Sequence, residues 1–213
     1  FITTLVFKLN TFLLEKIKLR EAKTTLISNA EMSRRVFFIH DYRDKDDAVY
    51  DAISDLMSSG RTSRLYRSLV RDQKIAAQAA GISGFPGTKY PHLFVFFGVP
   101  TPDNTPQQIR AAIHAEIDRL KTTLVTDEEL QMVRARAKVE LLQSLGDNQG
   151  LAIAFAKAQQ RYGDWREVFR SVEHIEKVTK EDIRRIANQV FVENNRTAAW
   201  IERADGAAPK GAK

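Results

Sequence analysis

The chain has 213 residues, of which 43% are apolar and 28% are charged. These values are ordinary for a globular domain with an apolar core, and they exclude a disordered, collagen-like or low-complexity chain. Cysteine is absent, which excludes a disulfide framework, a thiolate zinc site and a cysteine nucleophile.

The net charge of +6 is concentrated at the start of the chain. Residues 1–35 hold seven Lys or Arg and three Asp or Glu, which leaves 26 basic and 24 acidic residues over 36–213. A nucleic-acid partner requires a basic domain surface, so this distribution argues against one. No stretch approaches the ~20 apolar residues of a membrane-spanning helix. We therefore expect a soluble protein, cytoplasmic or periplasmic, without a membrane span.

In the first third of the chain the sequence predicts one strand followed by two helices. Residues 1–35 differ in composition from the rest and are expected to be an atypical leader without an assigned role. The apolar run Val36–Ile39 predicts a buried strand. A helix that ends at Ser58-Ser59-Gly60 is predicted by four apolar residues at helical spacing: Val49, Ile53, Leu56 and Met57.

A second helix is predicted from Thr62 or Ser63 to about Arg71. Residues Ile75–Phe85, rich in Ala and small residues, predict a strand of weak propensity. The segment His92–Val99 is apolar at nearly every position, so we expect it to be a strand in the centre of a sheet.

Most of the remaining chain is predicted to be helical. Thr105-Pro106 begins a helix that ends near Thr123, and the capping box Thr126–Glu129 begins a longer one through Leu142. Further helices are predicted at 151–162, at 164–171 and after the cap Thr179–Asp182. They are followed by a closing strand, 196–202, and a tail, 204–213, expected to be disordered. This order predicts an α+β fold, an antiparallel or mixed sheet with helices packed on one face.

Motifs for independent catalysis are missing from the sequence. The sequence has four histidines: His40, His92, His114 and His174. None of them lies in an H-x-x-E-H or H-E-x-x-H motif, which would place two zinc ligands on one face of a helix. There is no G-x-S-x-G nucleophile elbow, and Gly81, Gly84 and Gly87 precede a strand where a phosphate-binding loop needs a helix. The sequence therefore predicts no catalytic residue and no metal site of its own.

The most distinctive segment is a row of arginines in the second predicted helix. Arg64, Arg67 and Arg71 lie at positions i, i+3 and i+7, with Arg61 just ahead of them. Such a row can bind carboxylates or backbone carbonyls. The same spacing also fits a solvated helix face with local salt bridges.

The run from Asp41 to Asp72 resembles the second, non-catalytic half of insulinase/pitrilysin-like zinc metallopeptidases, in which a G-R-x-S-R-L helix leads to an arginine. The helix start Thr126–Leu130 and the segments 178–187 and 195–201 match the same family in order and spacing. The resemblance covers roughly residues 36–203. It implies one half of a clamshell whose other half carries H-x-x-E-H, binds zinc and activates water.

In this family the non-catalytic half supplies an arginine and, seven residues later, a tyrosine, which hold the substrate backbone. The resemblance places the arginine at Arg71 and the tyrosine position at Gln78, whose amide also donates hydrogen bonds. Arg64 in the same row is a further substrate-binding candidate. Zinc is expected in the partner domain, with no cofactor in this chain.

Three functions remain open at this stage. The first is the partner half of a zinc peptidase, inactive alone, which completes a peptide-binding chamber with an H-x-x-E-H domain. The second is a non-proteolytic scaffold derived from the same family, which the Gln78 substitution favours. The third is an unrelated binding module whose Arg61–Arg71 row takes an anionic ligand or nucleic acid. Self-association is possible in each case.

Overall fold

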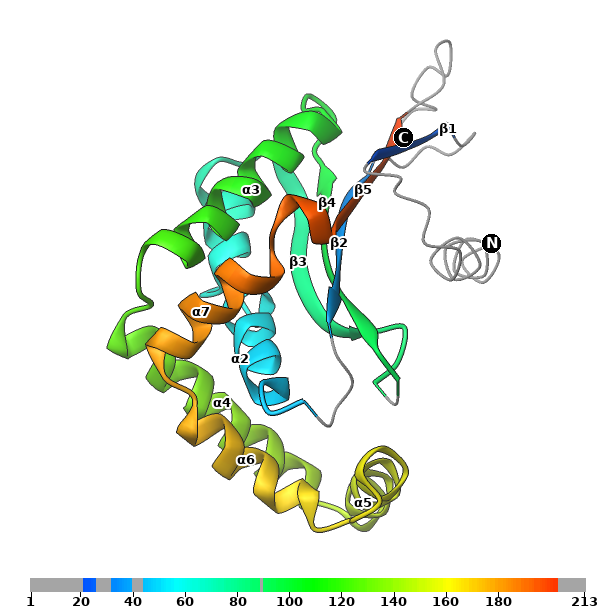
Figure 1. Ribbon diagram of the computed structural model, residues 1–213, viewed down its shortest axis with the longest axis vertical. Helices are drawn as coiled ribbons and strands as arrows, with labels where there is room; N and C mark the ends of the chain where they lie inside the picture. Colours follow the sequence, from blue (N-terminus) through cyan, green and yellow to red (C-terminus); the bar gives the residue numbers. More distant parts are fainter. Residues whose placement is uncertain (1–20, 26–31, 40–43, 89, 203–213) are drawn as a thin grey trace, which may run out of the picture.

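The fold is built on a five-stranded mixed sheet. A computed structural model describes residues 21–25, 32–39, 44–88 and 90–202 (Figure 1). The strands are β1 (Glu21–Thr25), β2 (Met32–Ile39), β3 (Ala76–Phe85), β4 (His92–Pro100) and β5 (Arg196–Glu202). They lie in the order β1-β5-β2-β4-β3, with β1 parallel to β5 and all other neighbours antiparallel.

The helices are packed on one face of this sheet, as Figure 1 shows. They are α2 (Asp47–Ser58), α3 (Pro106–Thr122), α4 (Asp127–Ser144), α5 (Asn148–Tyr162), α6 (Glu167–Lys177) and α7 (Lys180–Val190), with a π-helix η1 (Tyr66–Asp72) and a short 3₁₀ turn η2 (Glu193–Asn195). The predicted α+β class, with a mixed sheet and helices on one face, is confirmed. Within the described residues no helix is both long enough and apolar enough to cross a bilayer.

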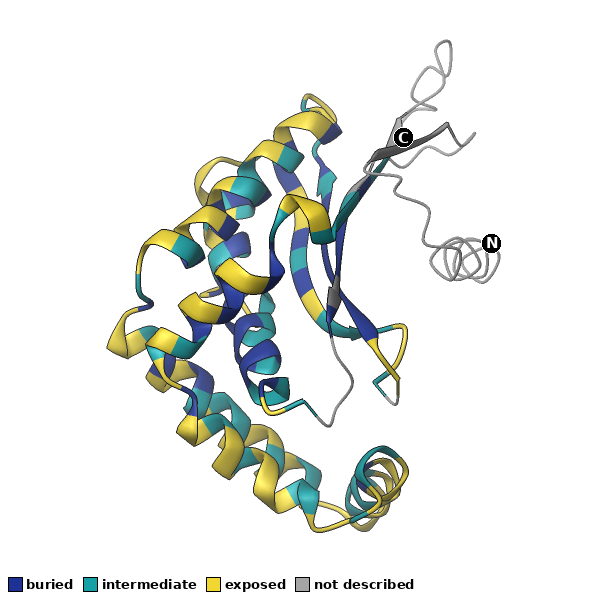
Figure 2. Ribbon diagram, viewed as in Figure 1, coloured by how far each residue is buried: buried dark blue, intermediate teal, exposed yellow. Residues whose placement is uncertain are grey.

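The main core lies between the sheet and the helices. As predicted, β4 lies inside the sheet, between β2 and β3, and its Phe94 and Phe96 are fully buried on the side of the helices. Phe191, just after α7, contacts both rings and that of Phe37 on β2, with ring centroids 5.0 to 5.2 Å apart. These rings are buried in the main core and join the end of α7 to the sheet. Figure 2 shows buried residues in dark blue on the strands and helices that face each other.

The opposite face of the sheet is also apolar. Val36 on β2 and Leu93 and Val95 on β4 form a second buried cluster, against which Phe85 packs. The alternation along β4 therefore places Phe94 and Phe96 on one face and their neighbours on the other. This explains why the sequence of β4 is apolar without interruption.

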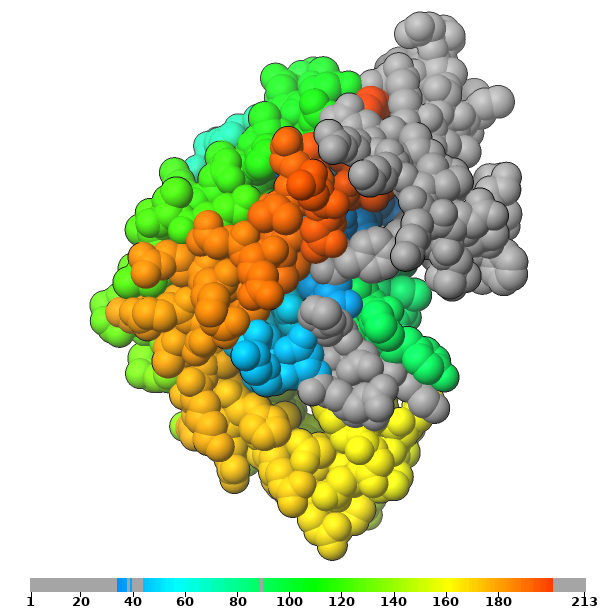
Figure 3. Space-filling model, in the orientation of Figure 1, coloured from blue at the N-terminus to red at the C-terminus, as the bar shows by residue number. Residues whose placement is uncertain are grey.

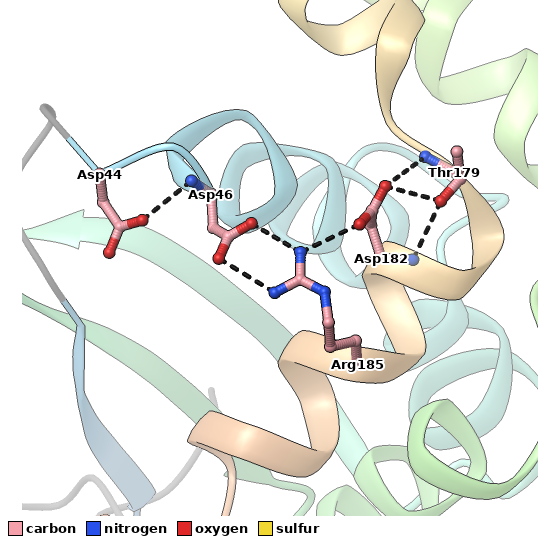
Figure 4. Close-up of polar contacts among 5 residues, drawn as sticks. All are labelled: Asp44, Asp46, Thr179, Asp182 and Arg185. Carbon is pink, nitrogen blue, oxygen red and sulfur yellow. Dashed lines mark hydrogen bonds and ion pairs between the residues drawn. The ribbon is translucent and has the colours of Figure 1, made fainter.

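A charged clamp joins α7 to the start of α2 (Figure 4). Arg185 on α7 donates from Nη1 and Nη2 to the two carboxylate oxygens of Asp46, at 3.1 and 2.6 Å. Nη2 also donates to Asp182, which closes the capping box with Thr179. In the space-filling view α7 (orange) lies against α2 (blue), and α5 (yellow) forms the lower end of the molecule (Figure 3).

Several boundaries differ from those predicted. β2 begins at Met32, ahead of the apolar run, and β1 is a strand that the local sequence did not predict. α6 runs from Glu167 to Lys177 instead of ending near Ser171. The domain boundary at residue 36 remains a prediction, and residues 1–20 and the tail 204–213 lie outside the described residues.

Candidate functional site

The segment that contains Arg64, Arg71 and Gln78 departs from regular backbone geometry at three places. Residues Tyr66–Asp72 form a π-helix rather than the predicted α-helix, because the N–H of Gln73 bonds the carbonyl of Ser68. Lys74 has a positive φ of 54°, and a β-bulge lies between Ala76 and Gln78. π-helices, left-handed non-glycine residues and bulges are each uncommon and cluster at functional sites. This segment is therefore the candidate site.

The bulge decides which way Gln78 faces. Ala76 and Ala79 are both buried in the core beneath the helices, 2% and 9% exposed, whereas Ala77 and Gln78 are exposed. Regular alternation from Ala76 would place Gln78 on the buried face. The extra residue of the bulge turns Gln78 to the exposed face of β3.

Arg71 lies at the end of η1, which packs against β3. Its side chain is 54% exposed and makes a two-point contact with the neighbouring Asp72: Nε donates to Oδ1 at 2.6 Å and Nη2 to Oδ2 at 3.1 Å. These hydrogen bonds lower the pKa of Asp72 and raise that of Arg71. Arg71 and Gln78 are therefore both exposed, one on each side of the connection 73–75.

Arg64 is held inside the fold. Its Nε and Nη2 donate to the two carboxylate oxygens of Glu129 at 2.8 and 2.6 Å, and the side chains are 13% and 21% exposed. Glu129 also accepts from the N–H of Thr126 in the capping box of α4. Burial opposes ionisation of Glu129, but the hydrogen bonds from Arg64 and Thr126 outweigh it and lower its pKa. Arg64 thus ties the start of the η1 segment to α4.

The arginine row predicted from the sequence is accordingly interleaved with carboxylates. Arg64 pairs with Glu129 and Arg71 pairs with Asp72, while the positive charge of Arg67 contributes to the lowered pKa of both carboxylates. Glu129 was missed as a partner because it is distant in sequence, although the capping box marked its position. The substrate-binding roles of Arg64, Arg71 and Gln78 are not tested by these contacts and stay predictions.

No group of three or more His, Cys, Asp or Glu side chains suited to a metal ion occurs in the described part of the chain. His92 is buried at the start of β4 with its Nδ1 3.1 Å from the carbonyl of Tyr90. His114 on α3 lies near Asp118, and burial lowers its pKa.

Two cavities lie elsewhere, among the helices. One of about 490 Å³ lies between α2, α4, α5 and α6, and one of about 740 Å³ lies where α2 meets α6 and α7. The ion pair between Asp47 and Arg161, at 2.9 Å, joins α2 to α5 beside them. Neither cavity is lined by Arg64, Arg71 or Gln78, so neither belongs to the candidate site.

The mixed sheet with helices packed on one face defines an α+β domain. The model of the family "Peptidase M16 inactive domain" matches residues 21–137, more than half of the chain, and the chain belongs to this family. The match begins at the first residue of β1. The resemblance to zinc metallopeptidases found in the sequence is confirmed.

The relatives of this chain include zinc proteases. The zinc protease PqqE of Helicobacter pylori is 25% identical over 166 residues, which cover 76% of this chain and 36% of that protein. The chain therefore spans about a third of this curated relative.

Solved structures share the fold at lower identity. A protease from Helicobacter pylori superposes with a TM-score of 0.79 at 20% identity, over 85% of this chain and 43% of that one. The inactive peptidase domain of a putative zinc protease from Bordetella parapertussis gives 0.73 at 19% identity, over 87% and 99% of the two chains. At these identities the likeness establishes the fold alone.

Proposed function

We propose that this chain is the non-catalytic half of a zinc-dependent peptidase. In this proposal it completes a peptide-binding chamber with an H-x-x-E-H domain, which binds the zinc, and it does not cleave peptides alone. Arg71 and Gln78 hold the substrate backbone. The observation that carries the proposal is that Arg71 and the bulge-turned Gln78 are both exposed within one irregular segment of an inactive peptidase domain.

The available donors suit a peptide carbonyl. Asp72 engages Nε and Nη2 of Arg71, which leaves the Nη1 hydrogens for a ligand. The amide nitrogen of Gln78 supplies a second donor. Positioned donors stabilise the negative charge that develops on a carbonyl oxygen during hydrolysis. In this proposal Arg64 holds the start of the segment in place and does not contact the substrate. A direct contact would require the ion pair of Arg64 with Glu129 to open.

The test uses the chain assembled with its H-x-x-E-H domain and measures peptide cleavage and zinc content. Arg71→Ala is expected to lower kcat/KM by about tenfold to a hundredfold, since it removes one donor to the developing charge. Arg170→Ala is the matched control, because Arg170 is an exposed arginine on α6 that pairs with Asp164 and Glu167. Unchanged cleavage by Arg71→Ala, or one equivalent of zinc retained by this chain alone, would refute the proposal.

A second candidate is a non-proteolytic scaffold domain of the same family. It is favoured by Gln78, which stands where the family resemblance implies a tyrosine and lacks an acidic hydroxyl. In that case the chain captures its partner domain, but Arg71→Ala changes neither capture nor cleavage. The anionic-ligand alternative is weakened, because carboxylates already engage Arg64 and Arg71.

A further inference from the structure

Asp72 is the residue in contact with Arg71, and it sits on a fixed piece of backbone. The end of η1 is held by two bonds between neighbouring turns: Gln73 donates its N–H to the carbonyl of Ser68 and its side-chain amide to the Ser68 hydroxyl, at 3.0 and 2.9 Å. Asp72 therefore presents its carboxylate to Arg71 from a defined position.

A guanidinium without a partner binds a carboxylate through two parallel N–H donors. In Arg71 the edge formed by Nε and Nη2 is already occupied by Asp72, in the same two-point geometry. The carboxylate also cancels the charge that would attract an acidic ligand. What remains is a pair with free N–H donors on Nη1 and free lone pairs on Asp72, which suits neutral and basic groups.

The charges around Arg71 make the exclusion of acidic ligands depend on Asp72. The positive charge of Arg67 contributes to the low pKa of both Asp72 and Glu129. Glu129 is committed to Arg64 and to the cap of α4. Loss of the Asp72 charge would leave both Arg67 and Arg71 without a compensating carboxylate on η1.

We propose that Asp72 is a specificity determinant of the peptide-holding site, which excludes acidic side chains and free carboxylates from Arg71 and selects neutral or basic peptide segments. This inference rests on the proposed function, in which Arg71 holds the peptide. It assigns to Asp72 a role in the choice of substrate rather than in the rate of hydrolysis.

The test compares Asp72→Asn with the wild type, each assembled with the H-x-x-E-H domain. The substrates are a cleaved neutral peptide and variants in which single glutamines are replaced by glutamate along its length. At the peptide positions that approach Arg71, we expect the wild type to cleave the glutamine peptide with a higher kcat/KM than the glutamate peptide. We expect Asp72→Asn to shift the ratio of these two kcat/KM values toward glutamate by about threefold to fivefold, the usual size of an exposed charge effect. Added salt should reduce the shift.

Two further variants separate the outcomes. Asp164→Asn removes a half-buried carboxylate that pairs with Arg166 and Arg170, and it should leave the ratio unchanged. If Arg71→Ala lowers cleavage but Asp72→Asn keeps the wild-type ratio at every position, the role of Asp72 is overturned and the proposed function stands. If Arg71→Ala leaves cleavage unchanged, the proposed function fails, and the role of Asp72 fails with it.

Discussion

Asp47 gives the sharpest prediction on stability. This first residue of α2 has a side chain only 14% exposed, and Arg161 of α5 donates to its two oxygens at 2.9 and 3.1 Å. Burial, followed by the negative charge of Asp51, raises its pKa to about 7, against the opposing effect of Arg161. Asp47 thus costs folding free energy when it is ionised.

The direction in which stability changes with pH follows from proton binding. Between the ordinary carboxyl pKa of 3.8 and about 7, the folded protein holds a proton that the unfolded chain has released. The contribution of Asp47 to stability is therefore complete below the unfolded pKa and is lost as the pH rises through about 7. Raising the pKa of Asp47 from 3.8 to about 7 corresponds to a ceiling of about 4 kcal/mol, and relaxation around the charge reduces this to about 2 kcal/mol.

Asp47→Asn keeps the shape and an acceptor for Arg161 but cannot ionise. We expect it to be close to the wild type near pH ~4, to gain on it as the pH rises toward ~7, and to be more stable by about 2 kcal/mol near pH ~8. Urea unfolding over this range measures the difference. Asp55→Asn is the matched substitution on the same helix, at a carboxylate that is 15% exposed and pairs with Arg136 on α4. Parallel pH curves for Asp47→Asn and the wild type would refute the reasoning.

Three other substitutions test the packing. Gly98→Ala should destabilise the fold by about 1–3 kcal/mol, because its Cβ would collide with Cγ2 of Ile109 on α3; chemical denaturation gives the value, and a neutral result would mean that α3 can shift. Phe191→Ala should cost about 3–5 kcal/mol by leaving a cavity among the core rings, and it should increase amide exchange in α7; unchanged exchange would contradict the role of this ring in joining α7 to the sheet. Glu129→Gln should cost about 1–3 kcal/mol, because Arg64 loses its charged partner and stays half-buried; a smaller loss in the Arg64→Met, Glu129→Gln double variant than in the single variant would confirm the coupling.

The candidate site was only partly predictable. The arginine row follows from residue spacing, and the family resemblance implied the roles of Arg71 and Gln78. The interaction of Arg64 with Glu129 joins residues 65 positions apart, which helix periodicity does not reveal. The exposure of Gln78 depends on a bulge that forms only when β3 pairs with β4.

The sequence by itself determined the elements whose signals are local. The capping boxes at Thr105, Thr126 and Thr179 each form between residues three apart, so the starts of α3, α4 and α7 could be predicted from a few neighbouring side chains. The apolar run of β4 likewise predicts a strand inside the sheet from its own residues alone.

Only the tertiary structure decided the sheet order, the parallel pairing of β1 with β5 and the π-helical form of η1. Backbone pairing between distant strands has no side-chain signature within either strand. The ion pair of Arg185 with Asp46 joins residues 139 positions apart. It could not be predicted from the sequence, because it forms only after α7 has packed against α2. Local hydrogen bonds and periodicity therefore fixed the helices and strands, and long-range packing left both Arg71 and Gln78 exposed.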